Sequence, residues 1–235
     1  PNGASFMNKK VTCFLPCRKG SQRIPNKNTK SFAGVDGGLL RIKLEQLANC
    51  PSIQKVILST NDEEVIKIAK SYSFDKLNII TRPEHLCTSE TSTDDLVKYV
   101  PEIISDEHIL WTHVTSPMLD SKEYEMIIKS YFSNLEIGFD SLMTVSKLQG
   151  FIWNESSPIT YDRNAEKWPR TQTIKPLYEI NSGVFLSSRE NYLSLSDRIG
   201  NKPFLYVQDK IKSTDVDWPD DFTLAEFIYS SNLSS

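Results

Sequence analysis

The sequence is poor in the residues that build metal knuckles and disulfide frameworks. Among its 235 residues it has only four cysteines and three histidines. No two cysteines form a C-x-x-C pair, and no histidine stands at zinc-knuckle spacing from a cysteine, which argues against a structural zinc site. Free thiols are typical of a reducing compartment, so we expect a cytoplasmic protein.

Long apolar runs and an excess of basic residues are also missing. No apolar run approaches the length of a membrane span, and we expect neither a signal peptide nor a membrane partner. Lysine and arginine number 27 against 30 acidic residues, a net charge of −3. Such a chain has no general basic field to gather nucleic acid, so any anion site has to be built locally.

The length fits one α/β domain, or one domain with an inserted arm. Residues 1–6 precede Met7 and are excluded as a remnant of expression, which leaves residues 7–235 as a single domain.

Short apolar runs alternate with segments of helical spacing. Strands are expected at residues 11–15, 55–60, 77–81, 108–114, 142–145 and 183–186, and helices at residues 39–47, 62–72, 92–104, 121–132 and 221–229. This rhythm predicts an α/β fold with a doubly wound, mainly parallel sheet and helices on both faces.

One stretch breaks the rhythm. Residues 147–178 are rich in Trp, Pro, Asn and Thr and lack helical periodicity. A loop of this length is uncommon in a compact domain unless it serves as a lid or an interaction arm. Its aromatic side chains need a partner surface, either in their own domain or on another chain. We interpret the stretch as an inserted arm.

A basic loop follows the first predicted strand. Residues 15–28 read L-P-C-R-K-G-S-Q-R-I-P-N-K-N, with four basic side chains around Gly20 and Ser21. Loops at the carboxyl ends of strands line the ligand crevice of a doubly wound sheet. Gly20 permits a tight turn whose amides face an anion, and Arg and Lys donors suit a polyphosphate. The charge count alone is equally consistent with a solvated loop.

An acidic triplet, Asp215-Val216-Asp217, lies before the last predicted helix. Alternate residues of an extended segment point the same way, so both carboxylates could reach one Mg²⁺ ion. Aspartate is also a common helix cap, and alone the triplet would favour that structural role. A phosphate cradle together with a metal pair indicates phosphoryl or nucleotidyl transfer.

In their order along the chain, these segments resemble the CMP-sialic acid synthetases, the acylneuraminate cytidylyltransferases. Residues 15–28 look like the opening signature of that family. The likeness continues through V-I-L-S-T-N at 56–61, R-P-E-H-L at 82–86, the hydroxyl-rich turn at 91–93, T-S-P at 115–117, N-S-G at 181–183 and the acidic triplet.

The resemblance implies an activity and a set of roles. A nucleotidyltransferase of this kind transfers CMP from CTP to the anomeric hydroxyl of a sialic-acid-like nonulosonic acid and releases pyrophosphate, with Mg²⁺ as cofactor. Its partners are CTP, the acidic sugar and a second copy of the chain, whose arm helps to close the sugar pocket. The implied residues are Arg18, Lys27 and Asp217 for catalysis; Arg18, Ser21, Arg23, Lys27, Asn28, Arg82, Thr91 and Thr93 for the nucleotide; His113 and Asn181 for the sugar; and Asp215 and Asp217 for the metal.

Three departures from the family pattern leave the acceptor open. Gln22 stands where many members carry Lys, His113 where sialic-acid enzymes usually carry Gln, and Gln149-Gly150 where the family has His-Pro. The sugar could be Kdo, a legionaminic or pseudaminic relative, or another sugar acid. A nucleotide-sugar glycosyltransferase is the rival enzyme class, but it usually places its Asp-x-Asp pair mid-domain. An inactive nucleotide-binding protein would carry lesions in the cradle or the metal pair.

Overall fold

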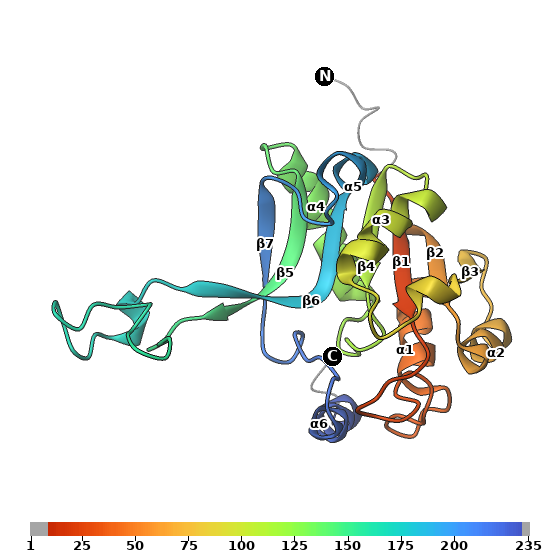
Figure 1. Ribbon diagram of the computed structural model, residues 1–235, viewed down its shortest axis with the longest axis horizontal. Helices are drawn as coiled ribbons and strands as arrows, with labels where there is room; N and C mark the ends of the chain where they lie inside the picture. Colours follow the sequence, from red (N-terminus) through yellow and green to blue (C-terminus); the bar gives the residue numbers. More distant parts are fainter. Residues whose placement is uncertain (1–8, 232–235) are drawn as a thin grey trace.

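A seven-stranded sheet runs through the centre of the molecule in the order β3-β2-β1-β4-β6-β5-β7 (Figure 1). The structure is a computed structural model and describes residues 9–231. The strands are β1 (Val11–Cys17), β2 (Ile53–Thr60), β3 (Leu77–Thr81), β4 (His108–Thr112), β5 (Ser141–Leu148), β6 (Leu177–Ser188) and β7 (Pro203–Gln208). Among them only β6 runs antiparallel to its neighbours. The predicted α/β class and mostly parallel sheet are therefore confirmed.

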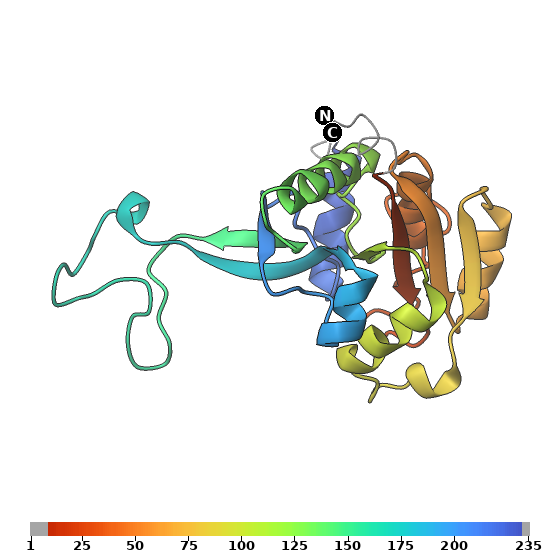
Figure 2. The ribbon, with the colours of Figure 1, turned by 90° about the horizontal axis from the view of Figure 1, so that it is seen from above.

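Helices cover both faces of this sheet (Figure 2). They are α1 (Gly38–Ala48), α2 (Glu63–Ser71), α3 (Thr93–Ile103), α4 (Ser121–Leu135), α5 (Arg189–Leu195) and α6 (Pro219–Ser230), with short 3-10 turns at Glu84–Leu86 and Thr171–Thr173. Buried side chains of α1, α2, α4 and α6 join one core cluster, and those of α3 and α5 join another on the opposite face. None of the helices in residues 9–231 is long and apolar enough to cross a bilayer.

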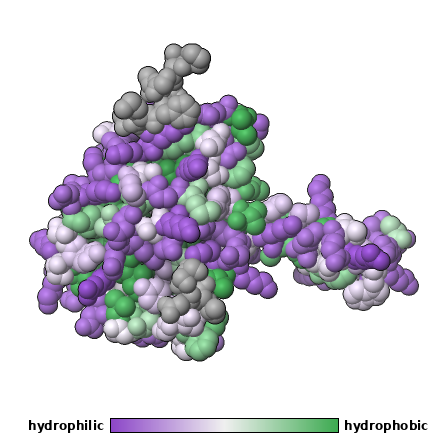
Figure 3. All heavy atoms as spheres, turned by 180° about the vertical axis from the view of Figure 1, so that it is seen from behind, coloured by the Kyte–Doolittle hydropathy of each residue, from purple (hydrophilic) through white to green (hydrophobic). Residues whose placement is uncertain are grey.

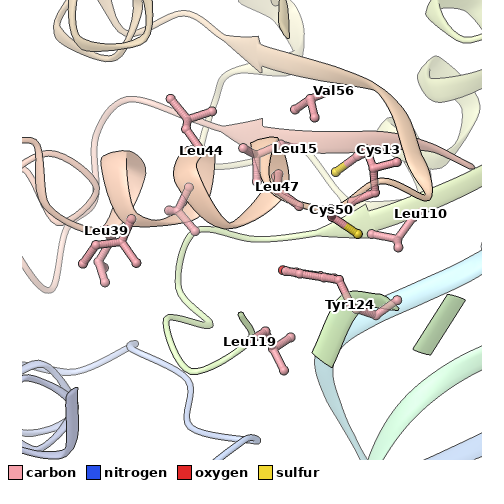
Figure 4. Close-up of a cluster of buried hydrophobic side chains, with 14 of the residues drawn as sticks. Cys13, Leu15, Leu39, Leu44, Leu47, Cys50, Val56, Leu110, Leu119 and Tyr124 are labelled. Carbon is pink, nitrogen blue, oxygen red and sulfur yellow. The ribbon is translucent and has the colours of Figure 1, made fainter. Parts of the chain in front are cut away.

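The central strands read as unbroken apolar runs because both of their faces are covered. In β1, the first five residues are fully buried. Leu44 and Leu47 of α1 pack on one face of it, together with Tyr124 of α4 (Figure 4). This two-sided core fixes the positions of the loops that leave the carboxyl ends of β1 and β4.

Several predicted boundaries were wrong. The strand expected over residues 108–114 ends at Thr112, and the last helix begins at Pro219 rather than Asp221. The sequence reading missed α5 and β7 entirely, and it did not foresee that β6 is antiparallel. The prediction for residues 1–6 falls outside the described residues.

The arm is the end of a long β-hairpin rather than a wholly irregular loop. Strands β5 and β6 stay paired out to Leu148 and Leu177, so both ends of the predicted 147–178 segment are strand. The rest projects away from the body of the molecule and stands clear of it from every side shown (Figures 1, 2 and 3). The arm's aromatic side chains therefore do not pack into the body.

A substitution at Gly38 tests how tightly α1 abuts the loop before it. Gly38 has φ +58°, and a Cβ there would collide with the backbone carbonyl of Lys30. We expect Gly38→Ala to lower the free energy of unfolding by about 3 kcal/mol, measured by urea denaturation. Gly34→Ala is the matched control. Gly34 has φ +79° but open space around it, so it should lose only about 1 kcal/mol from backbone strain. Equal losses would contradict the close approach.

Candidate active site

A cleft opens at the carboxyl ends of β1 and β4, where the sheet order reverses direction between these two neighbouring strands. Ligands of open α/β sheets bind at such a switch point. The main cavity has a volume of about 420 Å³. Its walls come from the loop after β1, from Ser89, from the residues after β4 and from Asp217 near the C-terminal helix. Four segments that are distant in sequence therefore meet at one site.

The basic loop is folded by its own hydrogen bonds. The amides of Lys27 and Thr29 donate to the carbonyls of Ile24 (3.2 Å) and Asn26 (3.1 Å). Asn26 adopts a left-handed conformation with φ 54°, and Gly20 does so with φ 93°. The expected nucleotide residues of this loop all line the main cavity: Arg18, Ser21, Arg23, Lys27 and Asn28. Unlike an unstructured solvated loop, this segment therefore presents its cations from a defined backbone.

Asp217 faces these cations across the cavity. Its Oδ1 lies 3.4 Å from Nη1 of Arg23 and 4.0 Å from Nζ of Lys27. The carboxylate is about half exposed, with a side-chain exposure of 52%. An anionic ligand would compete with Asp217 for both cations, and a cation would compete with them for Asp217.

Asp215 lies beside Asp217 but does not line the cavity. Burial raises its pKa, a hydrogen bond with the Thr115 side chain opposes the rise, and repulsion from Asp217 adds to it. Burial and the neighbouring carboxylate both disfavour the charged form of Asp215, and a cation close to the pair would relieve this.

The carboxylates fit a magnesium ion that takes part of its coordination from the substrate. No cluster of three or more His, Cys, Asp or Glu side chains capable of holding a metal occurs in residues 9–231. Mg²⁺ is usually held by one or two carboxylates, with water and substrate phosphates completing the shell. Asp215 and Asp217 could supply that share.

A smaller cavity of about 300 Å³ adjoins the main one and shares Pro16, Arg18, Ser89 and His113 with it. Arg82 and Thr91 line it. The Arg82 side chain is buried and its Nη1 donates to the carbonyl of Leu86 (3.2 Å), yet its Nε has no partner within the described chain. Arg82 therefore brings a buried cation with an unpartnered Nε–H to the wall of this cavity. Thr93, by contrast, is an exposed first residue of α3 and lines neither cavity.

His113 lines both cavities, but its ring nitrogens are already engaged. Trp111 Nε1 donates to Nε2 of His113 (3.1 Å), so Nδ1 carries the proton and donates to the carbonyl of Ser182 (3.2 Å). Burial, with a smaller contribution from the positive charge of Arg198, lowers the pKa of His113 to about 4. In this arrangement His113 is neutral and has no free nitrogen for a sugar.

Asn181 lies at the root of the arm rather than in the cleft wall. Its Oδ1 accepts from the Thr144 hydroxyl (2.6 Å) and the Gly183 amide (3.1 Å), and its Nδ2 donates to Gln208 (3.0 Å). The amide therefore ties β5, β6 and β7 together. Asn181 lines neither of the two cavities.

Sequence reasoning assigned no role to two hydroxyl side chains of the site, those of Ser89 and Thr115. Thr115 could have been identified from the sequence, since it comes just after a buried strand. Ser89 had none, because it belongs to an irregular segment without periodicity.

The sequence profile of the family described as "Cytidylyltransferase" matches residues 12–224. The chain belongs to the cytidylyltransferase family. Its resemblance to the acylneuraminate branch is confirmed by two relatives. An N-acylneuraminate cytidylyltransferase of Escherichia coli O18:K1:H7 is 28% identical over 226 residues, which cover 93% of the chain and 52% of the relative. A pseudaminic acid cytidylyltransferase of Campylobacter jejuni is 24% identical over 235 residues, which cover 96% and 99%.

Two solved structures share this fold. A CMP:2-keto-3-deoxy-manno-octonic acid synthetase complexed with CTP superimposes with a TM-score of 0.67 at 16% identity, covering 94% of this chain and 99% of that one. A 4-diphosphocytidyl-2C-methyl-D-erythritol synthase from Anaerococcus prevotii gives 0.66 at 13% identity, covering 96% and 98%. The chain spans about half the length of the N-acylneuraminate cytidylyltransferases it matches, 52%, and nearly all of the pseudaminic acid enzyme.

Proposed function

We propose that this chain transfers CMP from CTP to the anomeric hydroxyl of a sialic-acid-like nonulosonic acid and releases pyrophosphate. The observation that carries the proposal is the cleft of a cytidylyltransferase-family chain in which Arg18, Arg23 and Lys27 face the carboxylate of Asp217. The names of the relatives favour a nonulosonic acceptor, since they act on N-acylneuraminate and pseudaminic acid.

The chain's own residues position the triphosphate and neutralise its charge. Arg18 and Lys27 would hold the phosphate oxygens while the sugar hydroxyl attacks the α-phosphate in line with the leaving pyrophosphate. CTP binding would draw Arg23 and Lys27 away from Asp217, which frees that carboxylate. Mg²⁺ held by Asp215 and Asp217 would supply neutralisation of phosphate oxygens and a lower pKa of the attacking hydroxyl.

The base would occupy the smaller cavity. The unpartnered Nε–H of Arg82 is a buried donor, and cytosine offers carbonyl and ring-nitrogen acceptors on its pairing edge. A buried donor left without its acceptor is unfavourable, so a base that satisfies Arg82 is selected over one that does not. Purines also carry acceptors, so the expected preference for CTP over purine triphosphates rests on the match to the cytidylyltransferase family.

A substrate panel tests the activity. The protein would be incubated with Mg²⁺, one triphosphate (CTP, ATP or GTP) and one sugar acid (N-acetylneuraminate, pseudaminate, legionaminate or Kdo), and pyrophosphate release and the mass of the sugar nucleotide would be measured. We expect a CMP-sugar with a nonulosonic acid. If product formed with Kdo alone, the acceptor would be Kdo rather than a nonulosonic acid. Equal rates with ATP and CTP would contradict the assignment of the smaller cavity to cytosine.

The arm supports a two-fold dimer as part of this proposal. Phe151 packs edge-on against Tyr161 and Trp168, with ring centroids 5.2 and 5.3 Å apart, yet Trp168 remains 71% exposed. Along the hairpin stalk, Leu177 and Ile180 are also exposed. An apolar surface of this kind on a projecting element is typical of a protein interface, and in a two-fold dimer each arm would cover the other subunit.

A charge on the stalk tests this arrangement. We expect Ile180→Lys to convert a dimer to monomers in sedimentation velocity and to lower the activity about tenfold, because a buried unpaired charge disfavours the interface. Ile137→Lys is the matched control, since Ile137 is equally apolar and 69% exposed but lies outside the arm. A wild-type protein that is monomeric and fully active at every dilution would overturn the dimer.

A further inference from the structure

Lys43 of α1 is a fully buried lysine without an acidic partner. Its side chain is 0% exposed, and none of the ion pairs formed among residues 9–231 includes it. Its ammonium donates to the backbone carbonyls of Ser116 (2.8 Å) and Leu119 (3.1 Å) and lies 4.8 Å from the ring centroid of Tyr124. A buried ammonium is unfavourable unless hydrogen bonds compensate it, so this placement needs a reason.

The two hydrogen bonds persist whether or not Lys43 is protonated. Burial lowers its pKa to about 7, partly offset by Cys13 and Asp120. The neutral amine still has two N–H donors, one for each carbonyl. The two hydrogen bonds of Lys43 to these carbonyls therefore do not depend on its charge.

The carbonyls belong to the turn that follows β4. Residues 116–119 are buried, and backbone polar groups in a buried turn must find partners. Gln46, one helical turn further along α1, donates to the carbonyl of Pro117 (2.8 Å). Two side chains of α1 thus hold three carbonyls of this turn, and Leu119 and Tyr124 pack near the same helix in the core (Figure 4).

The same turn holds the acidic pair. The carbonyl of Thr115 accepts from the amide of Val216 (2.9 Å), and the Thr115 side chain hydrogen-bonds to Asp215. Val216 itself is 0% exposed in the core. The carboxylates on either side of Val216 therefore take their position from the turn, and the turn takes its position from α1.

We propose that Lys43 is a positioning residue, which fixes the turn after β4 and through it the placement of Asp215 and Asp217 at the cleft. The proposal rests on the proposed function in so far as it treats these carboxylates as the metal pair. Residues that orient metal ligands from outside the coordination shell typically change metal affinity tenfold or more when they are lost.

Lys43→Met tests the proposal, because it keeps the apolar stem and removes the donors. We expect Mn²⁺ binding to the CTP complex, followed by electron paramagnetic resonance, to weaken about tenfold, while CTP affinity in EDTA stays within about twofold of the wild type. Hydrogen exchange at the Val216 amide, measured without ligand, should accelerate. Lys76→Met is the matched control, since Lys76 also donates to a backbone carbonyl, that of Cys50 (2.9 Å), outside the cleft; it should change neither readout.

If Lys43→Met does not fold, Gln46→Leu serves as the second variant. It removes the hydrogen bond from the half-buried Gln46 side chain to the Pro117 carbonyl in the same turn. We expect it to shift Mn²⁺ affinity and Val216 exchange in the same direction. Unchanged Mn²⁺ affinity and unchanged Val216 exchange in a folded variant would overturn the positioning role. Faster exchange at Val216 in a protein that makes no CMP-sugar would support the positioning role and contradict the proposed function instead.

Discussion

We expect Asp217→Asn to lower kcat by at least about a hundredfold, because the substitution removes a charge that the metal requires and leaves the side-chain volume unchanged. Removal of divalent cations with EDTA should have an equal or larger effect. The measurement is pyrophosphate release at saturating CTP and sugar acid over a range of Mg²⁺ concentrations. Asp220→Asn is the matched control, since Asp220 is an exposed acid in the first turn of α6 that does not line the cavity.

The same variant should behave differently toward CTP without metal. Asp217 lies within 4.0 Å of both Arg23 and Lys27, so its loss removes a competitor for these cations. CTP should therefore bind to Asp217→Asn in EDTA as tightly as to the wild type, or more tightly. Full activity in EDTA would contradict the metal assignment, and weakened binding in EDTA would mean that Asp217 contacts the nucleotide itself.

Loss of Lys27 should have the largest effect among the cations of the loop. Its Nζ lies 4.0 Å from Asp217 and its side chain is only 16% exposed, so it is held in place at the cavity wall. We expect Lys27→Met to lower kcat/KM by about a hundredfold to a thousandfold, because one preorganised donor to developing phosphate charge contributes that much.

Kinetics in which kcat and KM are separated check this expectation. Lys30→Met is the control, because Lys30 lies just after the basic loop but its ammonium sits over the ring of Phe222, 4.5 Å from the centroid, and lines neither cavity. An unchanged kcat with a raised KM would restrict Lys27 to ground-state binding of CTP. Equal losses in the two variants would show a general charge effect of the loop.

The part of the site that lies in one contiguous segment was predictable. Residues 18–28 carry their own signal, since a basic stretch with a turn glycine follows a buried strand, and all five expected residues of this loop line the cavity. Asp217 was predictable only in combination with the basic loop and the family resemblance, because the triplet alone favours a helix cap, and its ion pairs with Arg23 and Lys27 came only from the fold.

Other features depend on contacts between distant segments, which a sequence pattern does not encode. The β-α rhythm predicts parallel strands, but β5 and β6 are joined through the arm and pair as a hairpin, which makes β6 antiparallel. The edge strand β7 has an apolar run at residues 204–207 that the sequence analysis did not use, and its side chains are mostly half-buried rather than fully buried like those of β1. The sequence left open whether His113 contacts the sugar or is a satisfied histidine at a strand end, and the side chain of Trp111 and the carbonyl of the distant Ser182 occupy its nitrogens.

The cleft draws its two charges from segments about two hundred residues apart in the sequence, and this sets an order of events during synthesis. The loop with Arg18 and Lys27 leaves the ribosome early, whereas Asp217 emerges about two hundred residues later, at the stage when N-terminal segments have begun to fold. Val216 then has to enter the core and bond to Thr115 before its two neighbours face the cations. A nascent chain that lacks this last segment displays a cationic crevice without its acidic counterpart. The site therefore reaches electrostatic balance only after the segment around Asp217 has been made and Val216 has entered the core.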